Sequence, residues 1–481
     1  MFKLSQIFIG YTDGKKEAKF KENFEQYYYN YNLNYEKIME VDKFLLLGKK
    51  GTGKSLLSEY INKNAMSVHD WFCNISSYKQ FNFHELIHLK SREIKPNEYS
   101  LIWEWILLIE IARLVVTDQS ADSNLRDKVL RFFESNNFTL KLDMNKVVDI
   151  TKKGQINGTV LSKIFSLSGQ FGKDTKYSLG SYLDYIDDFR EVIIDLLHST
   201  ESKFTVIFDE LDDKFRNEEI YKSNIISLIK VTDKLNTMFF DERVKCKLIL
   251  LLRSDIFYKL NDPDLNKIEQ DNSVKIDWGN VTNFNAPLFS LVFTKIKQSV
   301  ESFKELSEFE LYRKLFPQRI HSYFPDEFIL GRTYFRPRDL VTYIRLYIEQ
   351  FPDETFFSKS GIKAVEQKYS EYLLKEVKNE MYGHVSEVEI NESFLLIKQF
   401  KKVEFTFDEI KTYLQQRTNI YKNIEIERSL KLLFDFSVIG NSWMGEGAKK
   451  PFYSWAYREN VEIDYDKKFV VHQGLRKELT L

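Results

Sequence analysis

The sequence contains little cysteine. Cys73 and Cys246 are the two cysteines among 481 residues, and each stands beside apolar residues in a segment with strand character. The paired spacing that is typical of zinc ligands or of a disulfide framework is therefore missing. We expect both thiols to be buried in the core of a cytoplasmic protein, where the environment is reducing.

Net charge and long uninterrupted apolar runs are also missing. Lysine and arginine number 70 against 71 aspartates and glutamates, so any contact with nucleic acid must depend on a local patch. The longest apolar stretch, 101–116, contains Glu104, Glu110 and Arg113, which predicts a buried helix and not a membrane span. The N-terminus has no signal-peptide pattern, so we expect no secretory signal. Together with the charged residues in the longest apolar stretch, this predicts no membrane partner.

Core-forming residues are plentiful. Hydrophobic residues make up 43% of the chain, with 40 phenylalanines and 27 tyrosines, which is typical of a globular protein. A prior of about 150 residues per domain predicts roughly two to four domains. No repeat period of 20 to 50 residues is present.

Strands alternate with helices in the first part of the chain. The segments "KFLLLG", "TVIFDE" and "KLILLLRS" read as short buried strands, and residues 55–63, 181–199 and 217–235 repeat apolar residues at helical spacing. This alternation predicts a parallel sheet with helices on both faces, in three layers. An insertion of more than a hundred residues separates the first two of these strands.

A phosphate-binding loop follows the first strand. Residues 48–55, "GKKGTGKS", fit G-x-x-x-x-G-K-[ST], with a strand before them and a helix after them. The glycines let successive backbone amides point at phosphate oxygens, and the helix beginning at Lys54 adds its positive end. Lys54 is predicted to reach the β- and γ-phosphates and Ser55 to bind Mg²⁺. The predicted nucleotide-binding residues here are Gly48, Lys49, Lys50, Gly51, Thr52, Gly53, Lys54, Ser55 and Leu56.

Acidic residues end the second strand. In "FTVIFDELDD" we expect Asp209 to hold Mg²⁺ and Glu210 to act as general base toward the attacking water. The alternative is a solvated acidic turn, since Asp212 and Asp213 follow.

Arginines mark two further positions. Arg253 ends the strand "KLILLLR" and is placed to sense a γ-phosphate, or else to pair with Asp255 or Asp209. In "YFRPRDLVTYIRLY", Arg336 and Arg338 precede a helix, where one of them is placed to reach the nucleotide; a pair of surface arginines is the alternative.

Three domains are predicted from these patterns. Residues 1–285 form the P-loop domain with a long insertion at 66–200, and residues 286–388 form a helical lid. Residues 389–481 read as three helices and two strands around a Gly/Lys turn, which is the outline of a winged helix.

The order of these motifs resembles the AAA+ and STAND branch of P-loop ATPases, and more narrowly the stand-alone ATPases of bacterial mobile elements and anti-phage defence loci. The stretches that carry the resemblance are "LGKKGTGKS", "LLRSDIF", "DLNKIEQDNSVKIDW", "RPRDL" and "FVVHQGLRKEL". It implies an α/β P-loop NTPase fold, ATP and Mg²⁺ as ligands, and Arg253 and Arg338 as the two sensors. It also implies adenine contacts from Gly10 and Tyr11, although the related branch has arginine where this chain has Tyr11.

Three shorter segments match known functional motifs only in part. "HELIH" at 84–88 matches a zinc-protease pattern without a third ligand nearby, and "LSGQ" at 167–170 lacks one glycine of the ABC signature. "NKIE" at 266–269 resembles a guanine-reading motif but does not end an apolar strand. We therefore expect neither a zinc enzyme, nor an ABC protein, nor a GTPase.

Three functions remain open. The first is an ATP-hydrolysing switch or assembly platform that works as a homo-oligomer or with a partner effector, in a defence or mobile-element setting that the resemblance implies. The second is a nucleic-acid motor that uses the winged helix, although the helix predicted to face DNA carries Glu425, Glu427 and Asp435 against Arg428 and Lys431. The third is an interaction module that does not hydrolyse ATP.

Overall fold

Two compact units make up the chain in the computed structural model, which describes residues 2–77, 96–135, 186–211, 219–382, 384–417, 421, 424–448, 450–458 and 461–481. The sheet unit consists of Asn32–Lys49 and Lys54–Ile276. The three-segment unit consists of Met1–Tyr31, Lys50–Gly53 and Asp277–Leu481. The predicted phosphate-binding loop at 48–55, called the phosphate loop below, is thus divided, with its tip in the three-segment unit and its two ends in the sheet unit.

A parallel sheet forms the centre of the sheet unit. Its strands lie in the order β2-β3-β4-β1-β5, and every described pair runs parallel. The predicted parallel sheet is therefore confirmed, and the carboxyl ends of the strands meet at one edge. The strands are β1 (Leu45–Gly48), β2 (Trp71–Ser77), β3 (Lys203–Asp209), β4 (Cys246–Arg253) and β5 (Ser273–Lys275).

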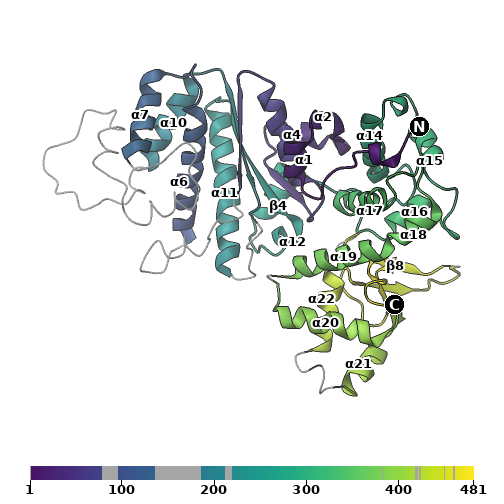
Figure 1. Cartoon of the computed structure of the whole chain (residues 1–481). Helices are drawn as coiled ribbons and strands as arrows, with labels where there is room; N and C mark the ends of the chain where they lie inside the picture. The colour runs from purple at the N-terminus through teal and green to yellow at the C-terminus, as the bar shows by residue number, and fades with distance from the viewer. Residues whose placement is uncertain are drawn as a thin grey trace. The chain divides into compact units, whose positions relative to one another are not determined.

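Helices cover both faces of this sheet (Figure 1). Helices α6 and α11 pack on one face of the sheet and α4 packs on the other. Helix α10 packs against α6, and α7 packs against α10. The sheet with its two helical layers makes a three-layer α/β fold, as the sequence predicts. The helices are α4 (Lys54–Met66), α6 (Pro96–Val115), α7 (Ser123–Ser135), α10 (Ile186–His198) and α11 (Glu219–Asp241).

The charged residues inside α6 are paired, which explains why an apolar helix contains them. Glu104 is 1% exposed and lies 2.6 Å from Arg190 and 2.8 Å from Lys234. Glu110, equally buried, pairs with Arg113 in the same helix. The predicted buried helix is confirmed, and no helix within the described ranges is long and apolar enough to cross a membrane.

Several element boundaries differ from the sequence-based expectation. The helix expected at 217–235 continues to Asp241, and the one expected at 181–199 is α10, with residues 181–185 outside the described ranges. Cys246 is buried as expected, but the expectation for Cys73 was wrong because that thiol is only half-buried. Its strand, β2, is the last strand on one side of the described sheet, so one edge of β2 has no neighbouring strand there.

The three-segment unit is helical through its middle. Helix α14 packs against α2, α15 and α17, and α17 packs against α19. The N-terminal helices of this unit are α1 (Gly14–Phe20) and α2 (Phe24–Tyr27). The later ones are α14 (Pro287–Ser299), α15 (Glu308–Leu315), α16 (Pro325–Leu330), α17 (Pro337–Gln350), α18 (Lys359–Ala364) and α19 (Glu366–Met381).

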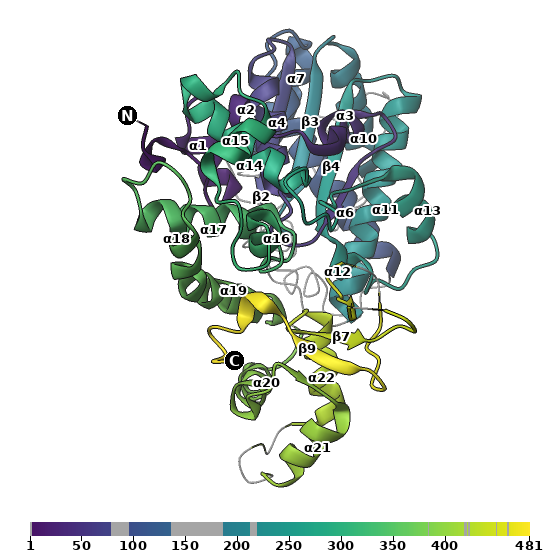
Figure 2. The ribbon, with the colours of Figure 1, turned by 90° about the vertical axis from the view of Figure 1, so that its right-hand side faces the viewer.

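Helices and an antiparallel sheet alternate at the end of the chain (Figure 2). The sheet order is β6-β9-β7-β8, and α22 packs against both α20 and β7. The two strands expected around a Gly/Lys turn are β7 and β8. The elements are α20 (Glu387–Phe400), β6 (Glu404–Phe405), α21 (Phe407–Gln415), α22 (Ile426–Asp435), β7 (Ile439–Trp443), β8 (Phe452–Ser454) and β9 (Lys468–Val471).

Candidate nucleotide site

The phosphate loop joins β1 to α4, as the sequence predicts. Gly51 has φ +81° and Gly53 has φ +104°, which is the left-handed region that side chains disfavour. A Cβ atom on Gly51 would also lie 3.2 Å from the Cβ of Arg338. The path of the loop therefore favours glycine at both positions, and a side chain at position 51 would also crowd Arg338.

Lys54 begins α4 and folds back over the start of the loop. Its Nζ donates hydrogen bonds to the backbone oxygens of Gly48 at 2.7 Å and Lys49 at 3.2 Å. The ammonium group is thus held beside the backbone at the start of the loop. Ser55 and Leu56 lie in the first turn of the same helix.

Asp209 and Glu210 lie at the carboxyl end of β3. Asp209 is 4% exposed, and its Oδ1 accepts a 2.8 Å hydrogen bond from the backbone N–H of Glu210. Glu210 has φ +61°, and its carboxylate accepts a hydrogen bond from the Ser77 hydroxyl of β2. A left-handed non-glycine residue costs about 1–3 kcal/mol and is concentrated at functional sites. The strain falls on the residue that the sequence predicts as general base.

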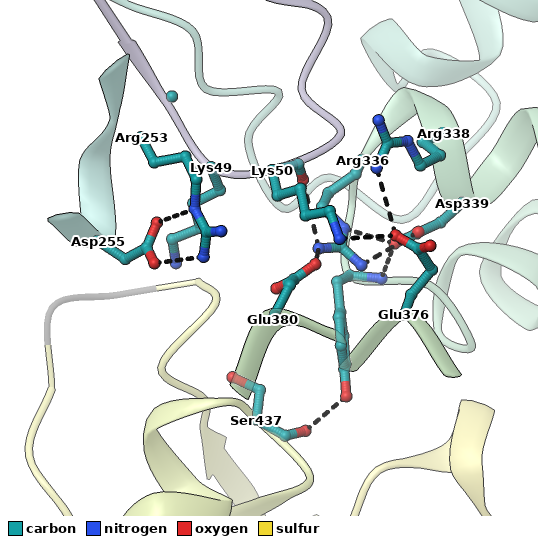
Figure 3. A network of polar contacts seen from close by, with 12 residues as sticks. Lys49, Lys50, Arg253, Asp255, Arg336, Arg338, Asp339, Glu376, Glu380 and Ser437 are labelled. Carbon is teal, nitrogen blue, oxygen red and sulfur yellow. Dashed lines mark hydrogen bonds and ion pairs between the residues drawn. The ribbon is translucent and has the colours of Figure 1, made fainter. Parts of the chain in front are cut away.

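Arg253 ends β4, directly opposite Gly48 in the β1–β4 register. Strand β4 lies between β1 and β3, so Arg253 stands at the sheet edge between the loop and the acidic strand. Its guanidinium pairs with both carboxylate oxygens of Asp255, at 3.0 and 2.6 Å (Figure 3). Of the two partners that the sequence left open, the structure pairs it with Asp255.

The loop tip contacts α17 and α19 within the three-segment unit (Figure 3). The Arg338 backbone N–H donates to the Gly51 oxygen at 3.4 Å, and its Nε donates to the Thr12 oxygen at 3.1 Å. Glu376 of α19 lies 3.3 Å from Arg338 and 3.4 Å from the Nζ of Lys50. Burial raises the pKa of the Glu376 carboxyl, but the cations Lys50, Arg338 and Arg336 outweigh burial and hold that pKa below its ordinary value.

Arg336 has a different environment from Arg338. It is 4% exposed, and its guanidinium pairs with Asp339 at 2.9 Å and Glu380 at 2.5 Å. Its Nη1 also donates to the Lys50 backbone oxygen at 3.3 Å. The alternative of two surface arginines was therefore wrong for Arg336, whose charge is buried and paired.

Gly10 and Tyr11 lie beside a buried ion pair. Gly10 has φ +114°, and a Cβ there would lie 2.5 Å from the Glu17 carboxylate. The Tyr11 N–H donates to that carboxylate at 2.9 Å, and Lys295 pairs with it from α14. Because Gly10 is required by this packing, its presence needs no adenine contact to explain it.

Trp278 contacts the loop, and this contact was not predicted from the sequence. Its indole N–H donates to the Thr52 backbone oxygen at 2.9 Å, and Tyr31 stacks on it with ring centroids 4.7 Å apart. Glu376 and Glu380 were missed as well. The signal available for them was an i, i+4 pair of acids within a predicted helix, which by itself indicates only one common face.

Of the three shorter sequence motifs, one lies within the described residues. The NKIE motif at 266–269 lies within α13 (Leu265–Asn272), so it does not end a strand. The motifs at 84–88 and 167–170 lie outside the described residues. Where the structure describes the chain, no three metal-ligating His, Cys, Asp or Glu side chains cluster.

Known proteins resemble parts of this chain. Residues 286–378 match the family described as the FunZ-associated C-terminal helical domain. A relative named "Putative transposon gamma-delta 80.3 kDa protein", from Escherichia coli (strain K12), is 24% identical over 249 residues, which cover 49% of this chain. That match spans only 33% of the relative's length. The structure of the Aeropyrum pernix ORC1 protein in complex with DNA aligns over 93% of this chain and 91% of its own, with 10% identity and a TM-score of 0.38.

Proposed function

We propose that this protein binds and hydrolyses ATP and acts as a nucleotide-dependent switch of the AAA+/STAND type. The observation that carries the proposal is the loop between β1 and α4, together with the polar residues at the carboxyl ends of two further strands of the sheet. These residues are Asp209 and Glu210 at the end of β3, and Arg253 at the end of β4. A glycine loop at a helix start binds phosphate, and acidic and basic groups at strand ends supply the rest of the chemistry.

The donor set suits Mg²⁺. Ser55 offers a hydroxyl and Asp209 a buried carboxylate, and Mg²⁺ is usually held by one or two such oxygens together with phosphate oxygens and water. When bound, the ion would neutralise charge on the phosphates. Glu210 would accept the proton of the attacking water, while Lys54 and Arg253 stabilise the charge on the phosphate.

The helical region 286–388 is proposed as a lid that responds to nucleotide. Support comes from Arg338 and Glu376, which contact the loop tip from α17 and α19. The matched helical-domain family also lies within this region, at residues 286–378. A lid anchored on the phosphate loop has a physical route by which phosphate occupancy changes its position.

Residues 389–481 are proposed as a winged helix that binds protein. Three helices and an antiparallel sheet support the first part. Support for a protein partner comes from α22, where Arg428 pairs with Glu389 at 2.7 Å and Lys431 with Asp435 at 3.4 Å. Cations neutralised in this way attract DNA phosphates weakly. The partner would be further copies of this chain or an effector protein.

A mobile-element or defence setting completes the proposal. The transposon protein to which half of this chain is similar supports the mobile-element part. That relative also keeps a second candidate open, a DNA-dependent ATPase that uses the winged helix.

An ATPase assay with and without duplex or single-stranded DNA, paired with mass measurement with and without ATP, tests the proposal. We expect hydrolysis and an ATP-dependent change in mass, both lost in Lys54→Ala. Lys63→Ala, on the same helix, serves as the control. Stimulation by DNA without a mass change would favour the motor, and absence of ATP binding would refute both.

A further inference from the structure

One carboxylate oxygen contacts two cations at the phosphate loop. Oε2 of Glu376 lies 3.4 Å from Nζ of Lys50, at the loop tip, and 3.3 Å from Nη1 of Arg338, at the start of α17 (Figure 3). The three side chains are 20–28% exposed, so the cluster is partly screened from water and still reachable by a ligand. Charge-assisted contacts in such a place are stronger than those on an open surface.

The neighbouring acids of α19 have other partners. Glu380, one turn further along, pairs with Arg336, whose guanidinium is also bound by Asp339. Glu371, about one turn earlier, lies on the exposed side and pairs with Lys375. The contact with both Lys50 and Arg338 is therefore a property of Glu376 and not of the helix in general.

A phosphate group and the Glu376 carboxylate seek the same partners. Lysine and arginine are the side chains that bind phosphate, and Lys50 belongs to the phosphate loop itself. An anion already seated on these cations lowers their attraction for a second anion and repels it directly. In the structure the cations lie on the carboxylate, and a bound phosphate would compete with it for them.

We propose that Glu376 is a positioning residue that holds Lys50 and Arg338 when ATP is absent and releases them to the terminal phosphate when ATP binds. This inference rests on the proposed ATP site. It identifies the contact through which the γ-phosphate competes with α19, so that phosphate occupancy loosens the helix from the loop tip. ADP, which lacks that phosphate, competes less.

Replacement of one charge tests the inference. Glu376→Gln keeps the shape of the side chain and removes its charge, and Glu371→Gln is the matched control on the same helix. Dissociation constants for Mg·ATP and Mg·ADP are measured by titration calorimetry in all three proteins. We expect Glu376→Gln to bind ATP at least about fivefold more tightly than wild type, the lower end of typical coupling, with little change for ADP. Glu371→Gln should match wild type for both nucleotides.

Hydrogen exchange gives a second readout. In wild type, ATP should raise amide exchange in α19, and in Glu376→Gln that exchange should already be high without nucleotide. If Glu376→Gln does not fold, Glu376→Asp, which keeps the charge but shortens its reach, should shift ATP affinity in the same direction by a smaller factor.

Unchanged or weaker ATP binding in Glu376→Gln, with wild type binding ATP normally, would overturn this inference and leave the ATPase proposal standing. A wild-type chain that binds neither nucleotide would refute the ATPase proposal, and the inference would fall with it.

Discussion

The indole N–H of Trp278 donates to the backbone oxygen of Thr52, a residue 226 positions earlier in the chain. Trp278 is 6% exposed and Tyr31 stacks on its ring, so the indole has little freedom to turn away. The hydrogen bond from Trp278 therefore restrains the phosphate loop, although Trp278 belongs neither to the loop nor to β1 or α4, the elements that flank it. A loop that binds phosphate through its amides depends on such restraint, because each amide must already point inward.

Replacement of this tryptophan should weaken ATP binding. Trp278→Phe keeps an aromatic ring for Tyr31 but leaves the Thr52 oxygen without its donor, at a cost of about 1–3 kcal/mol. Trp71→Phe is a matched control, because Trp71 also donates through its indole N–H, to Thr205 at 3.0 Å in the sheet unit. We expect both variants to lose similar thermal stability and only Trp278→Phe to lose ATP affinity. Equal affinities would show that the loop does not need this contact.

The general base is tested by a change of one atom. Glu210→Gln should bind ATP normally and hydrolyse it about 100-fold or more slowly, since a positioned general base contributes that much. The control is Glu219→Gln, at the exposed start of α11, where the acid pairs with Lys222. Single-turnover hydrolysis and nucleotide titration separate the chemical step from binding. Normal turnover in Glu210→Gln would exclude the base assignment.

Local sequence patterns were enough to predict the loop and the strand ends. The loop at 48–55 needs glycine where the backbone is left-handed, and this requirement is visible in the sequence. Arg253 and Asp209 follow apolar runs, and parallel strands bring their carboxyl ends to one edge. Strand β5, by contrast, has only three residues, which is too short to show a period of two.

Contacts between distant segments were not predictable in this way. Trp278 and Glu376 act on the loop only because the chain returns to it after more than 200 residues. In the sequence, Trp278 is notable only as the last residue before the strand-like apolar pattern stops, and Glu376 is one of several acidic residues in a predicted helix. Their partners depend on how α19 and the segment after β5 pack, which no single-sequence pattern specifies.

The buried pair Glu17–Lys295 should be sensitive to loss of either charge. The two residues are 3% and 2% exposed, and removal of one charge leaves the other buried without its counter-ion. We expect Glu17→Gln to lower the free energy of unfolding by about 3–5 kcal/mol. The double variant Glu17→Leu/Lys295→Met should recover most of this loss, because no charge remains buried. Chemical denaturation measures both.

The exposed pair Lys304–Glu301 provides the comparison within the same unit. Glu301→Gln should change the free energy of unfolding by less than about 1 kcal/mol, as is typical of a solvated ion pair. If Glu17→Gln and Glu301→Gln lower the free energy of unfolding by similar amounts, burial does not make the Glu17–Lys295 pair more sensitive to loss of a charge.

Lys247 should make stability depend on pH. This β4 lysine is 9% exposed, and burial, together with the charge of Lys203, lowers its pKa to about 7, against the opposing effect of Asp42 and Glu40. The unfolded chain, where the lysine has its ordinary pKa, binds more protons between about pH 7 and pH 10. The cost of the buried charge is therefore full below pH 7 and decreases as pH rises, by at most about 1.4 kcal/mol per pH unit.

Lys247→Met removes this titration. We expect the variant to be more stable than wild type at pH 6 and the difference to shrink by pH 10, as measured by urea unfolding at each pH. Lys245→Met, at an exposed position paired with Glu201, should show a small difference that does not change over this range. A constant difference for Lys247→Met would mean that the folded protein leaves the amine close to its ordinary pKa. In that case the amine would be hydrated in the folded state, and burial in β4 would not be the dominant influence on its charge.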